Sequence, residues 1–122
     1  MRRIKEDPKR EERIAMEIVV DAYDAGERAI GWHCYLDDAM KTPFRARVIA
    51  THPLSPLDKG EEVEVLGMGP ADVCLCDMFA RIRYGKKQFA VPLAQLQPLT
   101  DDTDTLQAVD DWHYWIARGY QF

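Results

Sequence analysis

The chain has 122 residues, of which 47% are hydrophobic and 30% are charged. This size and balance are typical of one folded domain and exclude disorder along the whole length. The formal net charge is −5, but residues 1–13 hold six basic and four acidic side chains, which leaves ten basic and 17 acidic side chains in the remainder. Such an acidic body attracts cations and repels phosphate backbones, so we expect no nucleic-acid partner.

The amino terminus carries no apolar stretch behind its charges and does not resemble a secretory signal. No segment is apolar for long enough to span a bilayer. The three cysteines, Cys34, Cys74 and Cys76, are an odd number, which favours reduced thiols over a disulfide framework. These features predict a cytoplasmic protein without a membrane partner.

Residues 1–10 are almost all charged around Pro8, so we expect a mobile charged arm before a single domain at 11–122. From Glu11, Ile14 and Ile18 recur at helical spacing and predict a first helix that reaches Asp24. Gly26 is a plausible break before a second helix, whose apolar face includes Trp32 and Leu36. That helix should end near Asp37-Asp38, ahead of Pro43.

Alternating apolar and polar residues then predict four strands, over 44–48, 61–66, 78–84 and 89–91. The last two should form a hairpin through Gly85-Lys86-Lys87, with Tyr84 facing inward. Leu93, Leu96 and Leu99 resemble a short helical turn that plugs the sheet.

Four or five short strands, each half apolar, most economically curl into a small barrel. A final helix should begin at the acidic cap 101–104 and run to Arg118. The fold class is therefore expected to be α+β, a small SH3/Sm-like β-barrel packed by two N-terminal helices and one C-terminal helix.

The acidic side chains are the first candidates for chemistry, because Ca²⁺ takes roughly six to eight oxygen ligands. Asp37 and Asp38 fall at a predicted helix C-terminus, where free carbonyls already make the potential negative. A bound divalent cation would turn this repulsion into a site. The alternative is a pair of solvated residues at the helix end, and spacing alone does not decide between them.

Glu17, Asp21 and Asp24 lie on one face of the first helix and could supply two or three oxygens to a cation shared with the neighbouring helix. We keep Asp21 and Asp24 as the weaker candidates. The alternative is a solvated face that is partly neutralised by Arg13 and Arg28.

Other acidic clusters have simpler explanations. The cluster at 101–104 lacks the later ligands and the glycine of an EF-hand loop, so helix capping explains it. Asp110 and Asp111 are expected on the solvated face of the last helix, whereas Asp72 and Asp77 fit loop ligands or surface charges equally well.

No motif predicts an enzyme. Cys74-x-Cys76 lacks the second closely spaced pair of a zinc site, and no nucleophile with a base or glycine-rich phosphate loop is present. His33 and His113 sit on apolar helix faces, where we expect packed, hydrogen-bonded side chains.

Several stretches carry a family resemblance: 11–14 with 17–24, Gly31-Trp32-x-x-Tyr35-Leu36, 60–68, Val91-Pro92-Leu93, 111–115 and Arg118-Gly119-Tyr120. Taken together, they resemble the bacterial calcium-binding protein CcbP family. The resemblance covers nearly the whole chain after residue 10. It implies reversible Ca²⁺ binding by acidic surface residues at more than one site of unequal strength. It also implies an important aspartate near the end of the second helix, matched here by Asp38 or Asp37.

The sequence thus predicts a cytoplasmic calcium buffer or sensor that is not an enzyme, with Asp38, Asp37, Asp21 and Asp24 as metal ligands. The alternative is an SH3-like module that binds a protein or peptide through the aromatic residues Trp32, Tyr35, Trp112, Tyr114 and Trp115.

Overall fold

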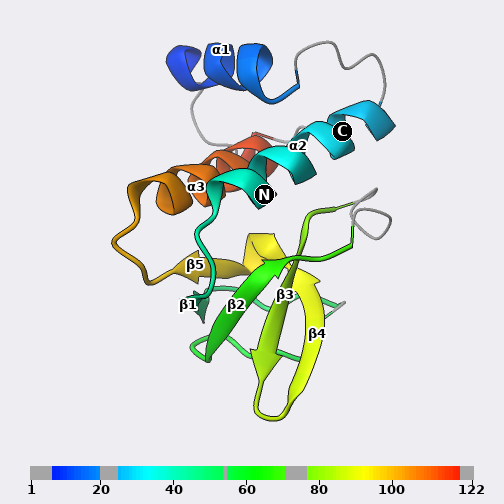
Figure 1. The fold of residues 1–122 in the computed structure, drawn as a ribbon, viewed down its shortest axis with the longest axis vertical. Coiled ribbons are helices and arrows are strands. Elements are labelled where there is room, and N and C mark those ends of the chain that lie inside the picture. Colours follow the sequence, from blue (N-terminus) through cyan, green and yellow to red (C-terminus); the bar gives the residue numbers. More distant parts are fainter. Residues whose placement is uncertain (1–6, 20–24, 54, 71–76, 119–122) are drawn as a thin grey trace.

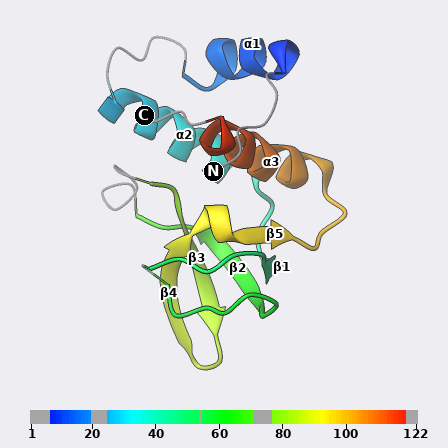
Figure 2. The same ribbon diagram turned by 180° about the vertical axis from the view of Figure 1, so that it is seen from behind.

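The computed structural model describes residues 7–19, 25–53, 55–70 and 77–118. Within these ranges it has three α-helices and one five-stranded antiparallel sheet, which confirms the α+β class. The elements form three layers: α1 lies outermost, α2 and α3 lie beneath it, and the sheet lies on the far side of that helix pair (Figure 1). The opposite view shows the same arrangement (Figure 2).

Helix α1 spans Pro8–Glu17 and begins three residues before Glu11, inside the stretch expected to be an arm. Asp7 caps it by accepting a hydrogen bond from the Arg10 amide at 3.1 Å, and Pro8 supplies a backbone angle suited to the first turn. The helix ends at Glu17, earlier than predicted; residues 1–6 and 20–24 lie outside the described residues.

Helix α2 spans Ala25–Ala39, so Gly26 lies inside it, while its end beside Asp37 and Asp38 confirms the prediction. Helix α3 spans Thr103–Ala117. Asp102 caps it by accepting a hydrogen bond from the Thr105 amide at 2.9 Å, as the acidic cluster predicted.

The strands are β1 (Phe44–Val48), β2 (Glu62–Met68), β3 (Phe79–Tyr84), β4 (Lys87–Pro92) and β5 (Leu96–Pro98). The turn between β3 and β4 contains Gly85 at φ +63°, which confirms the predicted hairpin. The expected helical plug is shorter than predicted: a 3₁₀ turn, η2, covers Leu93–Gln95, and Leu99 is exposed. Tyr84, expected to face inward, is also exposed.

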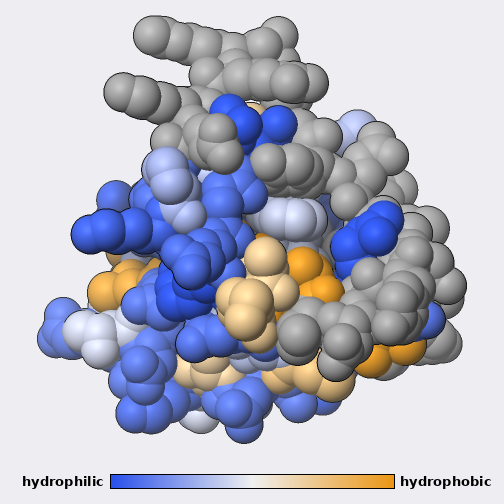
Figure 3. Space-filling model, turned by 90° about the horizontal axis from the view of Figure 1, so that it is seen from above, coloured by the Kyte–Doolittle hydropathy of each residue, from blue (hydrophilic) through white to orange (hydrophobic). Residues whose placement is uncertain are grey.

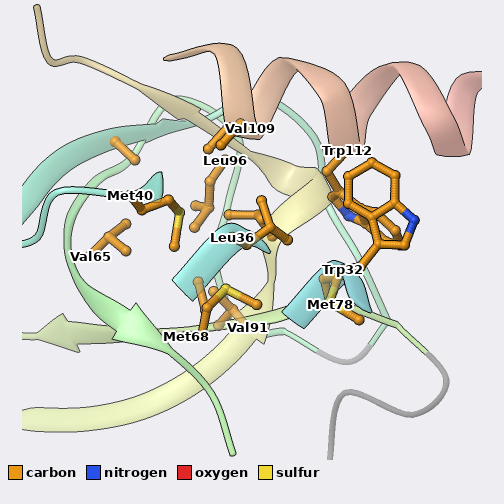
Figure 4. Packing of buried hydrophobic residues seen from close by; sticks show 14 of the residues in the cluster. Trp32, Leu36, Met40, Val65, Met68, Met78, Val91, Leu96, Val109 and Trp112 are labelled. Carbon is orange, nitrogen blue, oxygen red and sulfur yellow. The ribbon is translucent and has the colours of Figure 1, made fainter. Parts of the chain in front are cut away.

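The predicted barrel is wrong, because the sheet is open. Its strand order is β4-β3-β2-β1-β5, and β4 and β5 form its edges in the described part of the chain. The prediction assumed that the apolar faces of the strands could be buried only against one another. Instead, the helices cover the inner face: Val109 of α3 lies beside Leu96, and Leu36 of α2 lies between Leu96 and Val91 of the sheet (Figure 4). A helical cover removes the need for closure.

Aromatic residues pack between the two inner helices, α2 and α3, and do not form an exposed surface. The rings of Trp32 and Trp112 lie 5.1 Å apart between centroids at 69°, an edge-to-face contact that Figure 4 shows. Trp32, Trp112, Tyr114 and Trp115 are all at most 9% exposed, and Tyr35 is partly buried. The exposed aromatic groove on which the interaction-module alternative depended is therefore absent from this part of the structure.

Asp111 is fully buried, which corrects its expected place on a solvated face, while Asp110 is exposed. Arg13 of α1 donates two hydrogen bonds to the Asp111 carboxylate, from Nη1 to Oδ2 at 2.7 Å and from Nη2 to Oδ1 at 2.6 Å. Tyr35 of α2 donates a third at 2.8 Å. One carboxylate thus connects all three helices, and a two-point contact of this kind is among the strongest ion pairs in proteins.

The remaining contacts of α1 join it mainly to α3: Arg10 Nε lies 3.7 Å from the Asp111 carboxylate, and the Tyr114 hydroxyl donates to Glu11 at 3.1 Å. Ile14 and Ile18 are its buried apolar side chains, and the Asp7 amide donates to the Tyr114 hydroxyl at 2.8 Å. Gly31 of α2 lets the end of α1 approach closely, since a Cβ at this position would collide with the Ile18 carbonyl oxygen. No described helix has the length and apolar character required to cross a membrane.

Both helical histidines are packed and hydrogen-bonded as predicted. His33 Nε2 lies 2.9 Å from the Gly69 carbonyl oxygen, and His113 Nε2 lies 3.3 Å from that of Leu93. Burial lowers the pKa of His113 below its ordinary value of 6.5.

The buried ion pair predicts a large stability difference between two adjacent aspartates. Replacing Asp111 by Ala leaves Arg13 without its carboxylate and should lower the free energy of unfolding by about 3–5 kcal/mol. Asp110→Ala, at the exposed neighbouring position, should change the free energy of unfolding by no more than about 0.5 kcal/mol. Urea denaturation measures both, and equal losses would show that Asp111 has no special structural weight.

Gly31 predicts a reversal of the usual effect of alanine in a helix. Glycine to alanine inside a helix normally stabilises by up to about 1 kcal/mol. Gly31→Ala should instead destabilise, because the new Cβ meets the Ile18 carbonyl of α1. Gly26→Ala, at an exposed position of the same helix, is the matched control and should be neutral or stabilising. A higher melting temperature for Gly31→Ala would contradict the close approach.

His113 predicts a loss of stability in mild acid. Its pKa is lowered in the folded state, so its contribution is present above about pH 6.5 and is lost as the pH falls and the buried ring must take up a proton. The melting temperature of the native chain should therefore decrease more steeply between about pH 7 and about pH 5 than that of His113→Gln. Parallel pH profiles would exclude this residue as a cause.

Candidate metal centre

Asp37 and Asp38 occupy the last turn of α2, and both are exposed. The last turn contains no basic residue. Free backbone carbonyls and two carboxylates therefore concentrate negative charge at one helix end. The buried residues Leu36 and Met40 flank the pair and fix the turn that presents it.

The two aspartates line an open depression of about 680 Å³ between the ends of α1 and α2. We call it the helix-end depression; its lining includes Glu17, Ile18, Gly31, Tyr35, Asp37 and Asp38. Glu17 is exposed and is the last residue of α1. The fold thus brings a third carboxylate, from another helix, to the surface that carries the aspartate pair. Seen from the side of the helices, the described surface is mostly hydrophilic (Figure 3).

Two cationic side chains close to these carboxylates are paired elsewhere. Lys41 follows α2 directly, but its Nζ lies 3.2 Å from the carboxylate of Asp102. Arg13, four residues before Glu17, is held by Asp111 at 2.6 Å. This corrects the expectation that Arg13 neutralises the face containing Glu17. Among the described residues, no ion pair involves the three carboxylates of the depression.

A second, smaller hollow of about 240 Å³ adjoins Asp38. Asp104 in the first turn of α3 and Gln107 one turn later line it together with Tyr35 and Lys41. Asp38 therefore borders both hollows, whereas Asp37 borders the helix-end depression and not the smaller one. Burial raises the pKa of Tyr35, and its hydrogen bond to Asp111 raises it further, so the hydroxyl between the hollows stays protonated.

The other two proposed ligands, Asp21 and Asp24, lie outside the described residues, as do Asp72, Cys74 and Cys76. The sequence placed Glu17 with Asp21 and Asp24 as an oxygen donor on one helix face, but the predicted ligand set kept only the two aspartates. Its position next to α2 depends on how α1 packs, and no local sequence pattern encodes that packing. The signal in the sequence that pointed to Glu17 was its position on the same acidic helix face as Asp21 and Asp24.

The donor set suits a hard cation bound at an open surface. Carboxylates, helix-end carbonyls and a hydroxyl are oxygen donors, and Ca²⁺ accepts irregular shells of six to eight oxygens that include water. Within the described ranges, no three side chains of His, Cys, Asp or Glu converge closely enough to hold an ion. The arrangement therefore fits Ca²⁺ with water and main-chain ligands better than a tetrahedral zinc site.

Comparisons with known proteins agree with this chemistry. A model of the CcbP family, described as calcium binding, matches residues 12–116. The crystal structure of Anabaena CcbP superposes with a TM-score of 0.88 at 41% identity and covers 100% of both chains. A structure of a calcium binding protein in the calcium-binding form gives a TM-score of 0.84, also at 41% identity and 100% coverage of both. No functionally curated protein matches the chain.

The family match spans most of the chain, and the structural likeness extends over all of it. It includes the helices that carry the candidate ligands as well as the sheet. The chain therefore belongs to the CcbP family of calcium-binding proteins.

Proposed function

We propose that this protein binds Ca²⁺ reversibly at the helix-end depression, with Asp37 and Asp38 as its central ligands, and acts as a calcium buffer or sensor in the cytoplasm. One observation carries the proposal: an exposed aspartate pair lies at a helix C-terminus, and no described cation pairs with it. Membership of a calcium-binding family, and the likeness to a protein in its calcium-binding form, support the choice of ion. Asp21 and Asp24 remain candidates for a weaker site.

The affinity should be modest. Calcium affinity rises with the number of carboxylates and with the rigidity of the site. The carboxylates here lie on an open surface and converge on no preformed cage. We therefore expect a dissociation constant on the order of 10⁻⁶–10⁻⁴ M.

The choice between buffer and sensor depends on Glu17. Asp37 and Asp38 belong to one turn of α2, so an ion bound by them alone moves no element relative to another. Such a site would act as a buffer. An ion that also recruits Glu17 would draw α1 toward α2 and so convert binding into a change of shape. Amide chemical shifts confined to the end of α2 favour buffering, and shifts that extend along α1 favour sensing.

We assign no catalytic role, because the candidate site supplies ligands and charge without a nucleophile and base in contact. The interaction-module alternative has lost its main support, since the aromatic residues that it required are largely buried.

The metal site predicts a selective loss of binding. Asp38→Asn removes a charge that borders both hollows and should weaken Ca²⁺ binding about tenfold or more, while Asp37→Asn should weaken it less. Isothermal titration of metal-stripped protein measures both constants. Asp58→Asn, an equal charge change at an exposed loop position before β2, is the control and should change the constant less than about twofold.

Absence of calcium heat from the native chain would refute the proposal. If Asp58→Asn and Asp38→Asn weaken Ca²⁺ binding equally, there is no local site, and Ca²⁺ is attracted by the overall negative charge of the protein.

A further inference from the structure

Arg13 and Glu17 are placed to neutralise each other. They lie four residues apart on α1, the spacing at which opposite charges on a helix usually pair. Both side chains also line a hollow of about 290 Å³ on the outer side of α1. An arginine paired with Glu17 would occupy a carboxylate that the helix-end depression presents to a cation.

The structure shows a different pairing. Both terminal nitrogens of Arg13 contact the Asp111 carboxylate, at 2.7 and 2.6 Å, and Glu17 has no ion pair among the described residues. Asp111 is the stronger partner because it is fully buried, whereas Glu17 is exposed to water. A two-point contact in a low-dielectric setting is stronger than a solvated pair along a helix.

Asp111 also has a direct structural link to the depression. Tyr35 lines the helix-end depression and donates its hydroxyl hydrogen to Asp111 at 2.8 Å. Arg13 approaches the same hydroxyl at 3.5 Å. The side chains of Tyr35 and Asp111 therefore hold the guanidinium of Arg13 toward the buried carboxylate and away from Glu17.

We propose that Asp111 is a positioning residue for calcium binding: by holding Arg13, it keeps Glu17 and the neighbouring aspartates free to attract the ion. Asp111 contacts no ion itself. The inference rests on the proposed function at Asp37 and Asp38, and it adds a residue more than 70 positions away in the sequence that sets the charge of the site.

The test compares Asp111→Asn, the double variant Arg13→Gln with Asp111→Asn, and Asp110→Asn as an exposed control with the same charge change. Asp111→Asn frees Arg13 to pair with Glu17 and should weaken Ca²⁺ binding by about fivefold. The double variant removes the freed cation, so affinity should return to within about twofold of the native chain. Asp110→Asn should stay within about twofold. Isothermal titration gives the constants, and melting curves without calcium give the stabilities.

Recovery of Ca²⁺ affinity in the double variant distinguishes two roles of Asp111, holding Arg13 away from Glu17 and holding α1 in place. If the residue only held α1 in place, the double variant would bind calcium as weakly as Asp111→Asn, and this result would overturn the inference. Native affinity in Asp111→Asn would overturn it as well. If Asp111→Asn does not fold, Arg13→Gln alone decides: unchanged or tighter binding supports the inference, and more than about threefold weaker binding contradicts it.

A crystal structure of calcium-free Asp111→Asn supplies a readout without the ion. The guanidinium of Arg13 should lie within ion-pair distance of Glu17, and its retention against the substituted amide side chain would overturn the inference. If the proposed function itself is wrong, the result differs: the native chain then gives no heat on titration with Ca²⁺, wherever the Arg13 side chain lies.

Discussion

The buried carboxylate of Asp111 is the constraint on which the arrangement of the helices depends. A charge without solvent exposure is tolerated only when it is paired and hydrogen-bonded. Arg13 and Tyr35 meet that requirement from two other helices. Because Ile14 is the one buried apolar side chain among the described residues of α1, with Ile18 directly after the helix, polar contacts have a large part in holding it against α2 and α3. The Asp111 cluster is the most buried of them, and Glu11 adds contacts to Tyr114 and Arg118.

The second constraint is the apolar face of the sheet. Strands with one apolar face need a cover, and the helix pair supplies it, so the sheet stays open with β4 and β5 as edges. Helix α2 has two tasks in this arrangement. Its buried Leu36 fixes the last turn on the sheet, and the next two residues, Asp37 and Asp38, point their charge to solvent. Packing thus fixes the backbone that carries the candidate ligands and leaves their side chains in solvent.

These two constraints connect structure to function through charge distribution. Lys41 and Arg13 line hollows that adjoin the carboxylates of the helix-end depression, and each is paired with another carboxylate. Negative charge therefore remains between the end of α1 and the second half of α2. In an acidic protein such a region differs from the general surface by its unpaired carboxylates and its helix-end carbonyls, and these are the properties that Ca²⁺ requires.

The sequence by itself determined the elements whose signals are local. Hydrophobic periodicity identified the helices and strands, the acidic cap marked the start of α3, and Asp37 and Asp38 were recognised at a helix end. Family motifs identified calcium as the ion. Tertiary structure alone decided that the sheet is open, that Asp111 is buried and that Glu17 lies beside α2. These outcomes arise from contacts between residues far apart in the chain, and an aspartate on a helix has the same local signature whether it meets water or a buried arginine.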